Sequence, residues 1–291
     1  MIVITAPTGN IGRSLLPLLL DAGAPVRVVA RDPARLPEAV RDRVEVVTGS
    51  HGDPATVDRA FAGARAVFWL VPPDASRTPE QAYLDFTRPA ARAFTTHGVT
   101  HVVGVSALGR GTPLAARAGL VTTSLAVDDL IAATGVAYRA LANPSFFENL
   151  LDDLDSIRDH GVLTDTAPAD HPVPLVATAD IATAAAHLLL TPTWTGVDTV
   201  PVPGPELLSP HDLAHQMTTT LGRPVRYHRD SLDDLRTTLL THGLNPAFVD
   251  AMVEMKAAKS HGLDAGTTPS PSGTTFAQWC AEVLKPAVDA R

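Results

Sequence analysis

The stretch Ile2–Gly12, which reads IVITAPTGNIG, decides the fold of this chain. An apolar run from Ile2 to Thr5 enters a turn of small residues, a leucine-rich helical pattern follows, and a second apolar run covers Val26 to Ala30. A strand, turn, helix and strand in this order set backbone N–H groups and a helix N-terminus against the pyrophosphate of a dinucleotide. The residues of this turn expected to bind the cofactor are Thr8, Gly9, Asn10, Ile11, Gly12 and Arg13.

The turn departs from the usual glycine pattern at its first position. The first glycine of a G-x-x-G-x-x-G motif would fall at position 6, where this chain has Ala6. If this position needs a positive φ, alanine costs on the order of 1 kcal/mol there. If φ is negative, the added methyl group crowds the cofactor instead. The substitution weakens the motif without removing it.

The end of the second strand favours NADP(H) over NAD(H). An NAD site usually carries Asp or Glu at this point, whereas this chain has Arg31, followed by Asp32. A guanidinium group can bind a 2′-phosphate through two hydrogen bonds, and Arg13 offers a second positive charge. Two alternatives stay open: both arginines are solvated surface residues, or Asp32 faces the ribose instead.

Further apolar runs predict a parallel sheet with helices on both faces. They cover Val44 to Thr48, Ala66 to Val71, Val102 to Val105 and Ala137 to Leu141, and helical patterns separate them. Ligands of such sheets bind beyond the carboxyl ends of the strands. The residues at these ends expected to contact the cofactor or the reacting atoms are Val71, Pro72, Ser106 and Asn143.

The expected fold is therefore α/β, a Rossmann-type doubly wound parallel sheet with a smaller C-terminal α/β lobe. We expect a nucleotide-binding domain over residues 1–150. Residues 151–291 are expected to form mainly a substrate-binding lobe, with some segments returning to the sheet. Proline-rich connectors interrupt this second half, and helical patterns near Pro210–Leu221, Leu232–His242 and Phe276–Val283 follow them.

Composition limits the partners. The chain has 291 residues, a formal net charge of -8 and one cysteine, Cys280, which excludes an internal disulfide. An acidic surface disfavours nucleic acid and anionic lipid, and no basic patch or membrane-length apolar run is visible. We expect a cytoplasmic protein with no metal site and a small-molecule substrate. Self-association as a homodimer is left open.

Several segments in order along the chain carry a family resemblance. They are the turn at Thr5–Gly12, the segment Ala30–Pro33, the strand end Val105–Ala107, the stretch Gly135–Asn149, the segment around Asp180, the turn Leu221–Val225 and Thr274–Phe276. With these segments the chain resembles the NmrA-like family of atypical short-chain dehydrogenases/reductases. It is most similar in pattern to the NAD(P)H:quinone oxidoreductase branch.

The resemblance implies roles for individual residues. Gly9 and Gly12 would line the pyrophosphate, and Arg31 would bind the adenosine 2′-phosphate. Ser106 would lie on the nicotinamide side, and either Ser106 or Asn143 would act catalytically by polarising the acceptor oxygen. The expected substrate-binding residues are Phe146 and Phe147. Simpler interpretations stay open for four of these residues: Ser106 only ends a strand, Asn143 is a turn residue, and Phe146 and Phe147 are core aromatics.

One departure from short-chain reductases bears on the chemistry. Those enzymes protonate a carbonyl with a tyrosine that has a lysine four residues later. Here Tyr83, Tyr138 and Tyr227 are followed at that spacing by Thr, Ala and Ser. A quinone tolerates this loss best, because solvent can protonate its delocalised reduced form.

Three functions fit these observations. The leading one is an NADPH-dependent oxidoreductase that transfers hydride to a quinone or related conjugated carbonyl. The second is an NmrA-like NADP-sensing regulatory protein without redox turnover. The third is the same hydride step in aromatic natural-product metabolism.

Overall fold

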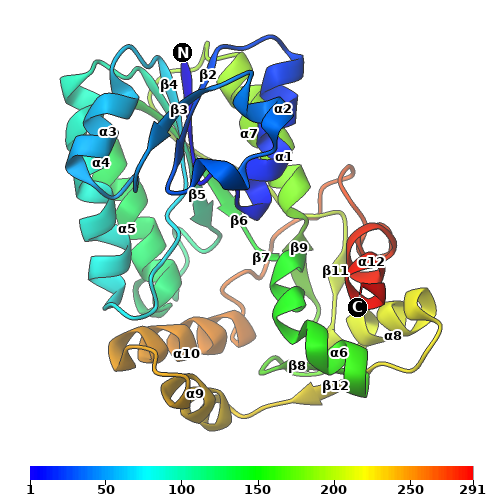
Figure 1. Cartoon of the computed structure of the whole chain (residues 1–291). Coiled ribbons are helices and arrows are strands. Elements are labelled where there is room, and N and C mark those ends of the chain that lie inside the picture. The colour runs from blue at the N-terminus through cyan, green and yellow to red at the C-terminus, as the bar shows by residue number, and fades with distance from the viewer. Residues whose placement is uncertain (291) are drawn as a thin grey trace. The chain divides into compact units, whose positions relative to one another are not determined.

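A seven-stranded parallel sheet is the largest sheet in the computed structural model, which describes residues 1–290 (Figure 1). Its strands in spatial order are β10 (Val197–Pro201), β6 (Ala137–Asn143), β5 (His101–Ala107), β4 (Ala66–Trp69), β1 (Ile2–Thr5), β2 (Val26–Ala30) and β3 (Glu45–Thr48). The strand order changes direction at β1. Strands β2 and β3 lie on one side of β1, and β4 and the later strands lie on the other side. Ligands of doubly wound sheets bind at such a reversal.

Helices cover both faces of this sheet. They are α1 (Asn10–Asp21), α2 (Glu38–Arg41), α3 (Pro54–Phe61), α4 (Phe86–Thr96), α5 (Leu120–Ala132) and α7 (Thr178–Leu190), with short turns η1 (Pro33–Arg35) and η2 (Glu80–Asp85). Figure 1 shows α3, α4 and α5 on one face and α1 and α7 on the other. Local signals start them: Asp53 caps α3 by accepting from the N–H of Thr56 at 2.8 Å, with Pro54 in the first turn.

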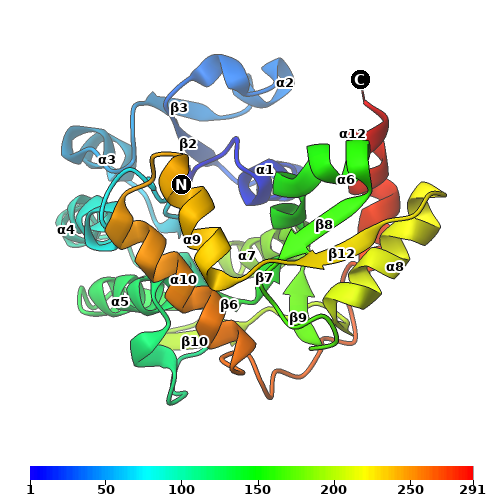
Figure 2. The same ribbon diagram turned by 90° about the horizontal axis from the view of Figure 1, so that it is seen from below.

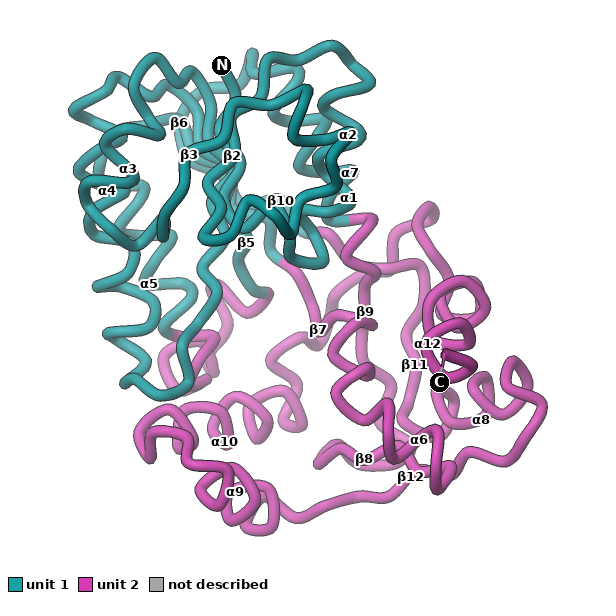
Figure 3. Tube along the Cα trace, viewed as in Figure 1, with its two compact units in different colours: residues 1–107, 123–142, 181–201 teal, residues 108–122, 143–180, 202–291 magenta. Residues whose placement is uncertain are grey.

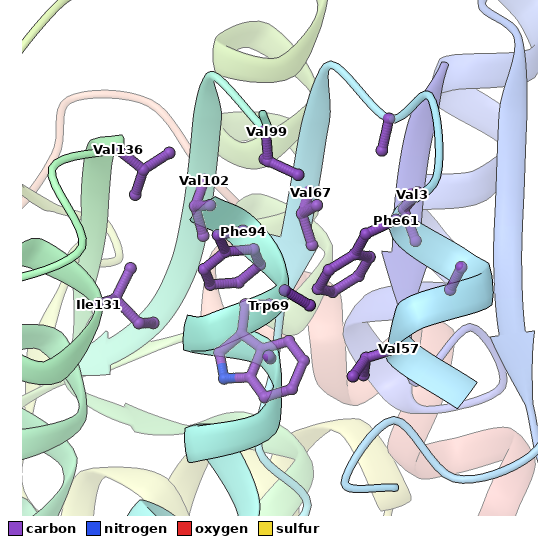
Figure 4. Packing of buried hydrophobic residues seen from close by; sticks show 14 of the residues in the cluster. Val3, Val57, Phe61, Val67, Trp69, Phe94, Val99, Val102, Ile131 and Val136 are labelled. Carbon is purple, nitrogen blue, oxygen red and sulfur yellow. The ribbon is translucent and has the colours of Figure 1, made fainter. Parts of the chain in front are cut away.

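The main core of the sheet lies under α3, α4 and α5 (Figure 4). Phe61 of α3 stacks on Phe94 of α4 with 5.1 Å between ring centroids. Trp69 of β4 is 1% exposed and packs edge-on against Phe94. This packing fixes β4 and therefore the residues that follow it at the carboxyl edge.

The chain forms two compact units (Figure 3). The sheet unit comprises residues 1–107, 123–142 and 181–201, and the second unit, here called the lobe, comprises residues 108–122, 143–180 and 202–291. The lobe holds a three-stranded sheet in the order β11-β9-β7 and a parallel pair, β12 and β8, which lie side by side in Figure 2.

The strands of the lobe are β7 (Ser145–Phe146), β8 (Val162–Asp165), β9 (Val173–Val176), β11 (Leu207–Leu208) and β12 (Arg226–Arg229). Its helices are α6 (Leu154–His160), α8 (Pro210–Leu221), α9 (Leu232–Thr241), α10 (Pro246–Ser260), α11 (Phe276–Trp279) and α12 (Lys285–Asp289), with η3 (Ala115–Arg117), η4 (Phe147–Asp153) and η5 (Cys280–Leu284). None of the helices within residues 1–290 is long and apolar enough to cross a membrane.

The expected doubly wound α/β fold is confirmed, and six of its seven strands lie within two residues of the expected runs. The seventh strand, β10, lies in the second half of the chain, where a segment returning to the sheet was expected without defined bounds. The lobe differs more from expectation. Helix α10 was not predicted, and the C-terminal helical segment continues to Asp289 instead of ending at Val283. A start signal for α10 is present, because Asn245 caps it by accepting from the N–H of Ala247 at 3.0 Å, followed by Pro246.

Candidate functional site

The turn after β1 adopts the geometry that the glycine pattern requires. Ala6 has a φ of 48°, the only positive φ of a residue other than glycine within residues 1–290. Its carbonyl oxygen accepts a hydrogen bond from the N–H of Gly9 at 3.1 Å. A Cβ atom on Gly12 would lie 2.3 Å from this oxygen and 2.8 Å from the Cα of Pro7. Position 12 therefore requires glycine for the turn to pack on the helix.

Helix α1 presents an N-terminus that no side chain caps. Gly9 is the N-cap residue with φ -78° and ψ 172°, and the first turn contains no acidic residue. A Cβ atom on Gly9 would meet only the Ala6 carbonyl oxygen, at 3.4 Å, an ordinary contact distance. The first N–H groups of the helix and its dipole are thus available to an anion. This arrangement fits the pyrophosphate of a dinucleotide.

Side chains of the first turn contribute unequally. Ile11 is 2% exposed and belongs to the core, so only its backbone N–H group is a candidate contact. Asn10 accepts a hydrogen bond from the Arg13 guanidinium at 2.6 Å. This pair is exposed. Thr8 is half-buried beside it.

The end of β2 offers a cation rather than a carboxylate. Arg31 is exposed directly after the strand. The Asp32 carboxylate accepts the N–H of Ala34 at 3.0 Å and so caps η1. Because this oxygen already has a local partner, Arg31 is the better candidate for the adenosine ribose and its phosphate.

A buried histidine lies near Arg31. His51 is 6% exposed, and its Nε2 lies 2.9 Å from the carbonyl oxygen of Leu70. Its ring packs edge-on against Trp69 and Phe86, with centroid distances of 5.2 and 4.9 Å. Burial, assisted by the positive charge of Arg31, lowers the pKa of His51 to about 4, although the hydrogen bond to Leu70 opposes the change. The imidazole is therefore neutral at pH 7.

A buried threonine joins the turn to the end of β4. The hydroxyl of Thr5 donates to the carbonyl oxygen of Phe68 at 2.9 Å and accepts the N–H of Leu70 at 3.0 Å. Val71 is half-buried and Pro72 is exposed directly beyond this link. The link holds these two candidate cofactor contacts at the carboxyl edge next to the glycine turn.

Ser106 belongs to a buried chain of hydrogen bonds. Its hydroxyl donates to Asp128 Oδ2 at 2.5 Å, and the hydroxyl of Tyr138 donates to Asp128 Oδ1 at 2.6 Å. Gly104 leaves room for the tyrosine, since a Cβ atom there would lie 2.3 Å from its hydroxyl oxygen. The carboxylate therefore orients the Ser106 hydroxyl, so the serine oxygen is better suited to accept a hydrogen bond from a ligand than to donate one.

The remaining candidates lie in the lobe. Asn143 is 2% exposed, and its main-chain carbonyl oxygen accepts a hydrogen bond from the N–H of Leu108 at 3.0 Å. Phe146 is half-buried in β7. Phe147 is 1% exposed and packs on Phe276 and Trp279, with centroid distances of 5.1 and 5.7 Å. In this structure Phe147 supports the core of the lobe, so Phe146 is the aromatic residue better placed to contact a solute.

Two features of the site were not predicted as such from the sequence. The sequence predicted Ser106 at a strand end but not its hydrogen-bond partners. Asp128 lies 22 positions after Ser106, and Tyr138 lies 10 positions after Asp128, so local pattern does not connect them. For His51 the signal existed, since it follows the third strand, but its burial depends on Trp69 and Phe86 from later segments.

Comparison with known proteins agrees with this geometry. A family model described as NAD(P)H-binding matches residues 7–192. A (4-alkanoyl-5-oxo-2,5-dihydrofuran-3-yl)methyl phosphate reductase of Streptomyces griseus is 32% identical over 97% of both chains. An NAD(P)H azoreductase of Xenophilus azovorans is 28% identical over 96% of both, and quinone oxidoreductase 2 of Escherichia coli is 25% identical over 90% of this chain and 89% of its own.

Solved structures share the fold. The triphenylmethane reductase of Citrobacter sp., complexed with NADP(H), aligns with a TM-score of 0.79 and 20% identity over 99% of this chain and 100% of its own. NmrA, a negative transcriptional regulator solved with NADP, aligns with a TM-score of 0.72 and 14% identity over 99% of this chain and 97% of its own. At sequence identities of 20% and 14%, these two structures show only that the fold is shared.

Proposed function

This chain belongs to the NAD(P)H-binding family and is an oxidoreductase of that family, and from this premise we propose that it is an NADPH-dependent reductase of quinones or related conjugated carbonyls. The observation that carries the cofactor part of the proposal is the pairing of an uncapped α1 N-terminus with Arg31. The amide groups at the start of α1 would bind the pyrophosphate, and Arg31 would bind the 2′-phosphate. Asp32 uses one carboxylate oxygen to cap η1, which favours Arg31 over Asp32 as the residue that binds the adenosine ribose and its phosphate.

The proposed reaction needs little from the protein beyond binding and orientation. The bound nicotinamide supplies two electrons as hydride to a conjugated acceptor, and a proton from solvent completes the reduction. In this proposal Ser106 accepts a hydrogen bond on the nicotinamide side, because its own hydrogen goes to Asp128. The amide of Asn143 polarises the acceptor oxygen by donating to it. Phe146 faces the acceptor, with Phe147 behind it as support.

The relatives support a conjugated acceptor. The names of the three relatives describe reduction of an acylated unsaturated lactone that carries a methyl phosphate group, of an azo compound and of a quinone. All three compound classes contain a conjugated multiple bond, which can take up hydride with the developing charge delocalised. A step on an aromatic natural product belongs to the same chemistry.

A second function has its own support. NmrA, which shares the fold, is described as a transcriptional regulator in complex with NADP. The Ser106 hydroxyl is directed at a carboxylate, so it is a poor proton donor to a substrate. A protein that binds NADP without turnover would have these features as well.

Steady-state oxidation of NADPH, followed at 340 nm, separates the two functions. We expect turnover with 1,4-naphthoquinone, an unsaturated lactone and an azo dye, faster with NADPH than with NADH. An Asn143→Ala variant should lower kcat by about a hundredfold to a thousandfold, because one polarising hydrogen bond is lost. Tight binding of NADPH without turnover of any acceptor would favour the regulatory function.

A further inference from the structure

We infer that His51 selects the base of the dinucleotide, because its Nδ1 atom accepts a hydrogen bond from the 6-amino group of adenine. This inference rests on the proposed function, since it takes Arg31 as the residue that binds the 2′-phosphate of the adenosine ribose. It adds the residue that distinguishes one purine from another. All of the side chains that carry it belong to the sheet unit.

The ends of β2 and β3 place His51 beside Arg31. The two strands pair in parallel with Ala30 opposite Thr48, and the N–H of Gly49 donates to the carbonyl oxygen of Ala30 at 3.0 Å. Arg31 follows β2 directly, and His51 follows β3 by three residues. The base and the 2′-phosphate are attached to neighbouring carbon atoms of one ribose. A cofactor whose phosphate meets Arg31 therefore has its adenine near the loop that contains His51.

The ring of His51 is held in one orientation. Trp69 and Phe86 contact it edge-on, and Gly52 approaches Phe86 so closely that a Cβ atom there would lie 2.4 Å from the aromatic ring. The Nε2 atom lies 2.9 Å from the carbonyl oxygen of Leu70. A carbonyl oxygen only accepts, so Nε2 carries the hydrogen of the neutral ring and Nδ1 carries a lone pair.

The Nδ1 atom of His51 is an acceptor that a ligand can reach. It has no hydrogen-bond partner among residues 1–290, and it is not one of the polar atoms that are closed off from solvent without a partner. It therefore keeps accessible surface, although the residue as a whole is 6% exposed. Because burial lowers the pKa of His51 to about 4, the imidazole is neutral at pH 7 and Nδ1 remains an acceptor.

Adenine offers the complementary group. Its 6-amino group donates hydrogen bonds, whereas its ring nitrogens N3 and N7 are acceptors, which would face the lone pair of Nδ1 unfavourably. Guanine carries an acceptor oxygen at the same position of the purine, and so does hypoxanthine. Two acceptors repel each other, so the fixed lone pair of His51 favours adenine over both of these bases.

The neighbouring hydroxyl group cannot make this distinction. Ser50 precedes His51, and its hydroxyl oxygen accepts a hydrogen bond from the N–H of Gly52 at 3.3 Å. A hydroxyl both donates and accepts, so it can bind the oxygen of hypoxanthine as well as the amino group of adenine. A preference for the amino group over the oxygen therefore reports on the imidazole.

The experiment is isothermal titration calorimetry of the full chain at pH 7 with NADP⁺ and with nicotinamide hypoxanthine dinucleotide phosphate. In the second compound an oxygen replaces the 6-amino group of the base, and the ribose and phosphate groups are retained. We expect NADP⁺ to bind the original chain about tenfold more tightly, because loss of the hydrogen bond leaves the acceptor on His51 unsatisfied. Equal binding of the two compounds, or tighter binding of the hypoxanthine compound, would overturn the inference.

Three variants assign the preference to His51. His51→Phe keeps an aromatic ring between Trp69 and Phe86 but has no acceptor, so the two compounds should bind it equally. Ser50→Ala should keep the preference for adenine. Arg31→Ala should keep it as well, while it loses the preference for NADP⁺ over NAD⁺.

Two results separate this inference from the proposed function. A preference for adenine that persists in His51→Phe would overturn the inference and leave the proposed function intact. No binding of NADP⁺ to the original chain would contradict the proposed function, and this inference with it.

Discussion

At the scale of single residues, Ala6 is the clearest point of strain in the chain. Its φ of 48° lies in the left-handed region, which costs a residue with a Cβ atom roughly 1–2 kcal/mol. The turn retains this conformation because the Gly9 hydrogen bond and the close approach of Gly12 depend on it. From the sequence we expected alanine at position 6 to be unfavourable if its φ was positive, and the structure shows that this φ is positive.

Removing the methyl group should therefore stabilise the protein. For Ala6→Gly we expect a gain of about 1 kcal/mol in the free energy of unfolding, measured by urea denaturation. Ala22, with a φ of -77°, provides the control, because Ala22→Gly relieves no strain. A loss of stability in Ala6→Gly as large as that in Ala22→Gly would mean that position 6 is unstrained.

The contact between Tyr138 and Asp128 is a second residue-level feature. Tyr138→Phe removes a hydrogen bond to a buried carboxylate, so we expect a loss of about 1.5–3 kcal/mol in the free energy of unfolding. Tyr83 is the matched control, since its hydroxyl has no hydrogen bond in the described structure. Tyr83→Phe should change the stability by less than about 0.5 kcal/mol. Equal effects of both substitutions would show that the contact with Asp128 contributes nothing.

At the scale of elements, the two glycines of the turn have separable tasks. A Cβ atom fits at Gly9 but collides with the Ala6 carbonyl oxygen and Pro7 at Gly12. We expect Gly9→Ala to keep the free energy of unfolding within about 1 kcal/mol while it weakens NADPH binding, because the methyl group stands where the pyrophosphate approaches the amides. Gly12→Ala should lower stability by about 1–3 kcal/mol through overpacking.

Thermal melts and calorimetry on both variants provide the measurement. Full NADPH affinity in a folded Gly9→Ala protein would show that the pyrophosphate does not bind at this turn. A fully stable Gly12→Ala protein would contradict the packing of the turn on α1.

Elements differed in how well the sequence predicted them. The sheet strands are short runs of branched apolar residues between turn signals, so local pattern sufficed. Helix α10 was missed because its apolar residues, among them Phe248, Val249 and Val253, do not follow one face in a simple repeat. That omission hid Lys256 and its salt bridge with Asp165. The strands β8 and β12 pair over 60 residues apart in sequence, which local pattern does not reveal.

At the scale of the whole molecule, burial of His51 makes stability depend on pH. The pKa of His51 falls from 6.5 to about 4 on folding, so the unfolded chain binds the proton more tightly. Stability is therefore complete above pH 6.5 and declines as the pH falls from 6.5 toward 4. The full effect is about 3 kcal/mol.

A histidine-free variant isolates this effect. His51→Gln keeps a donor for the Leu70 carbonyl oxygen but does not titrate. We expect the loss of stability between pH 7 and pH 4 to be about 3 kcal/mol smaller in the variant than in the original chain, measured by urea denaturation. Parallel pH profiles for the two proteins would show that His51 is not buried in its neutral form.

The sequence was most informative about family and least about chemistry. The resemblance to NmrA-like proteins and quinone oxidoreductases is confirmed, because both kinds appear among the relatives and structural neighbours. The roles of Arg31, Asn143 and Phe146 remain predictions. The hydrogen bond from Ser106 to Asp128 could not be read from the sequence, because only the packing of α5 on the sheet brings the two side chains together.

Isothermal titration calorimetry with NADPH and NADH, on the original chain and on Arg31→Ala, tests the central claim most directly. Our account predicts that NADPH binds the original chain more tightly and that Arg31→Ala weakens NADPH binding about tenfold to a hundredfold, the value of a hydrogen bond to a charged group. NADH binding should stay the same, as should both affinities in the control Arg35→Ala. No heat with NADPH, or equal losses for both cofactors in Arg31→Ala, would contradict the account.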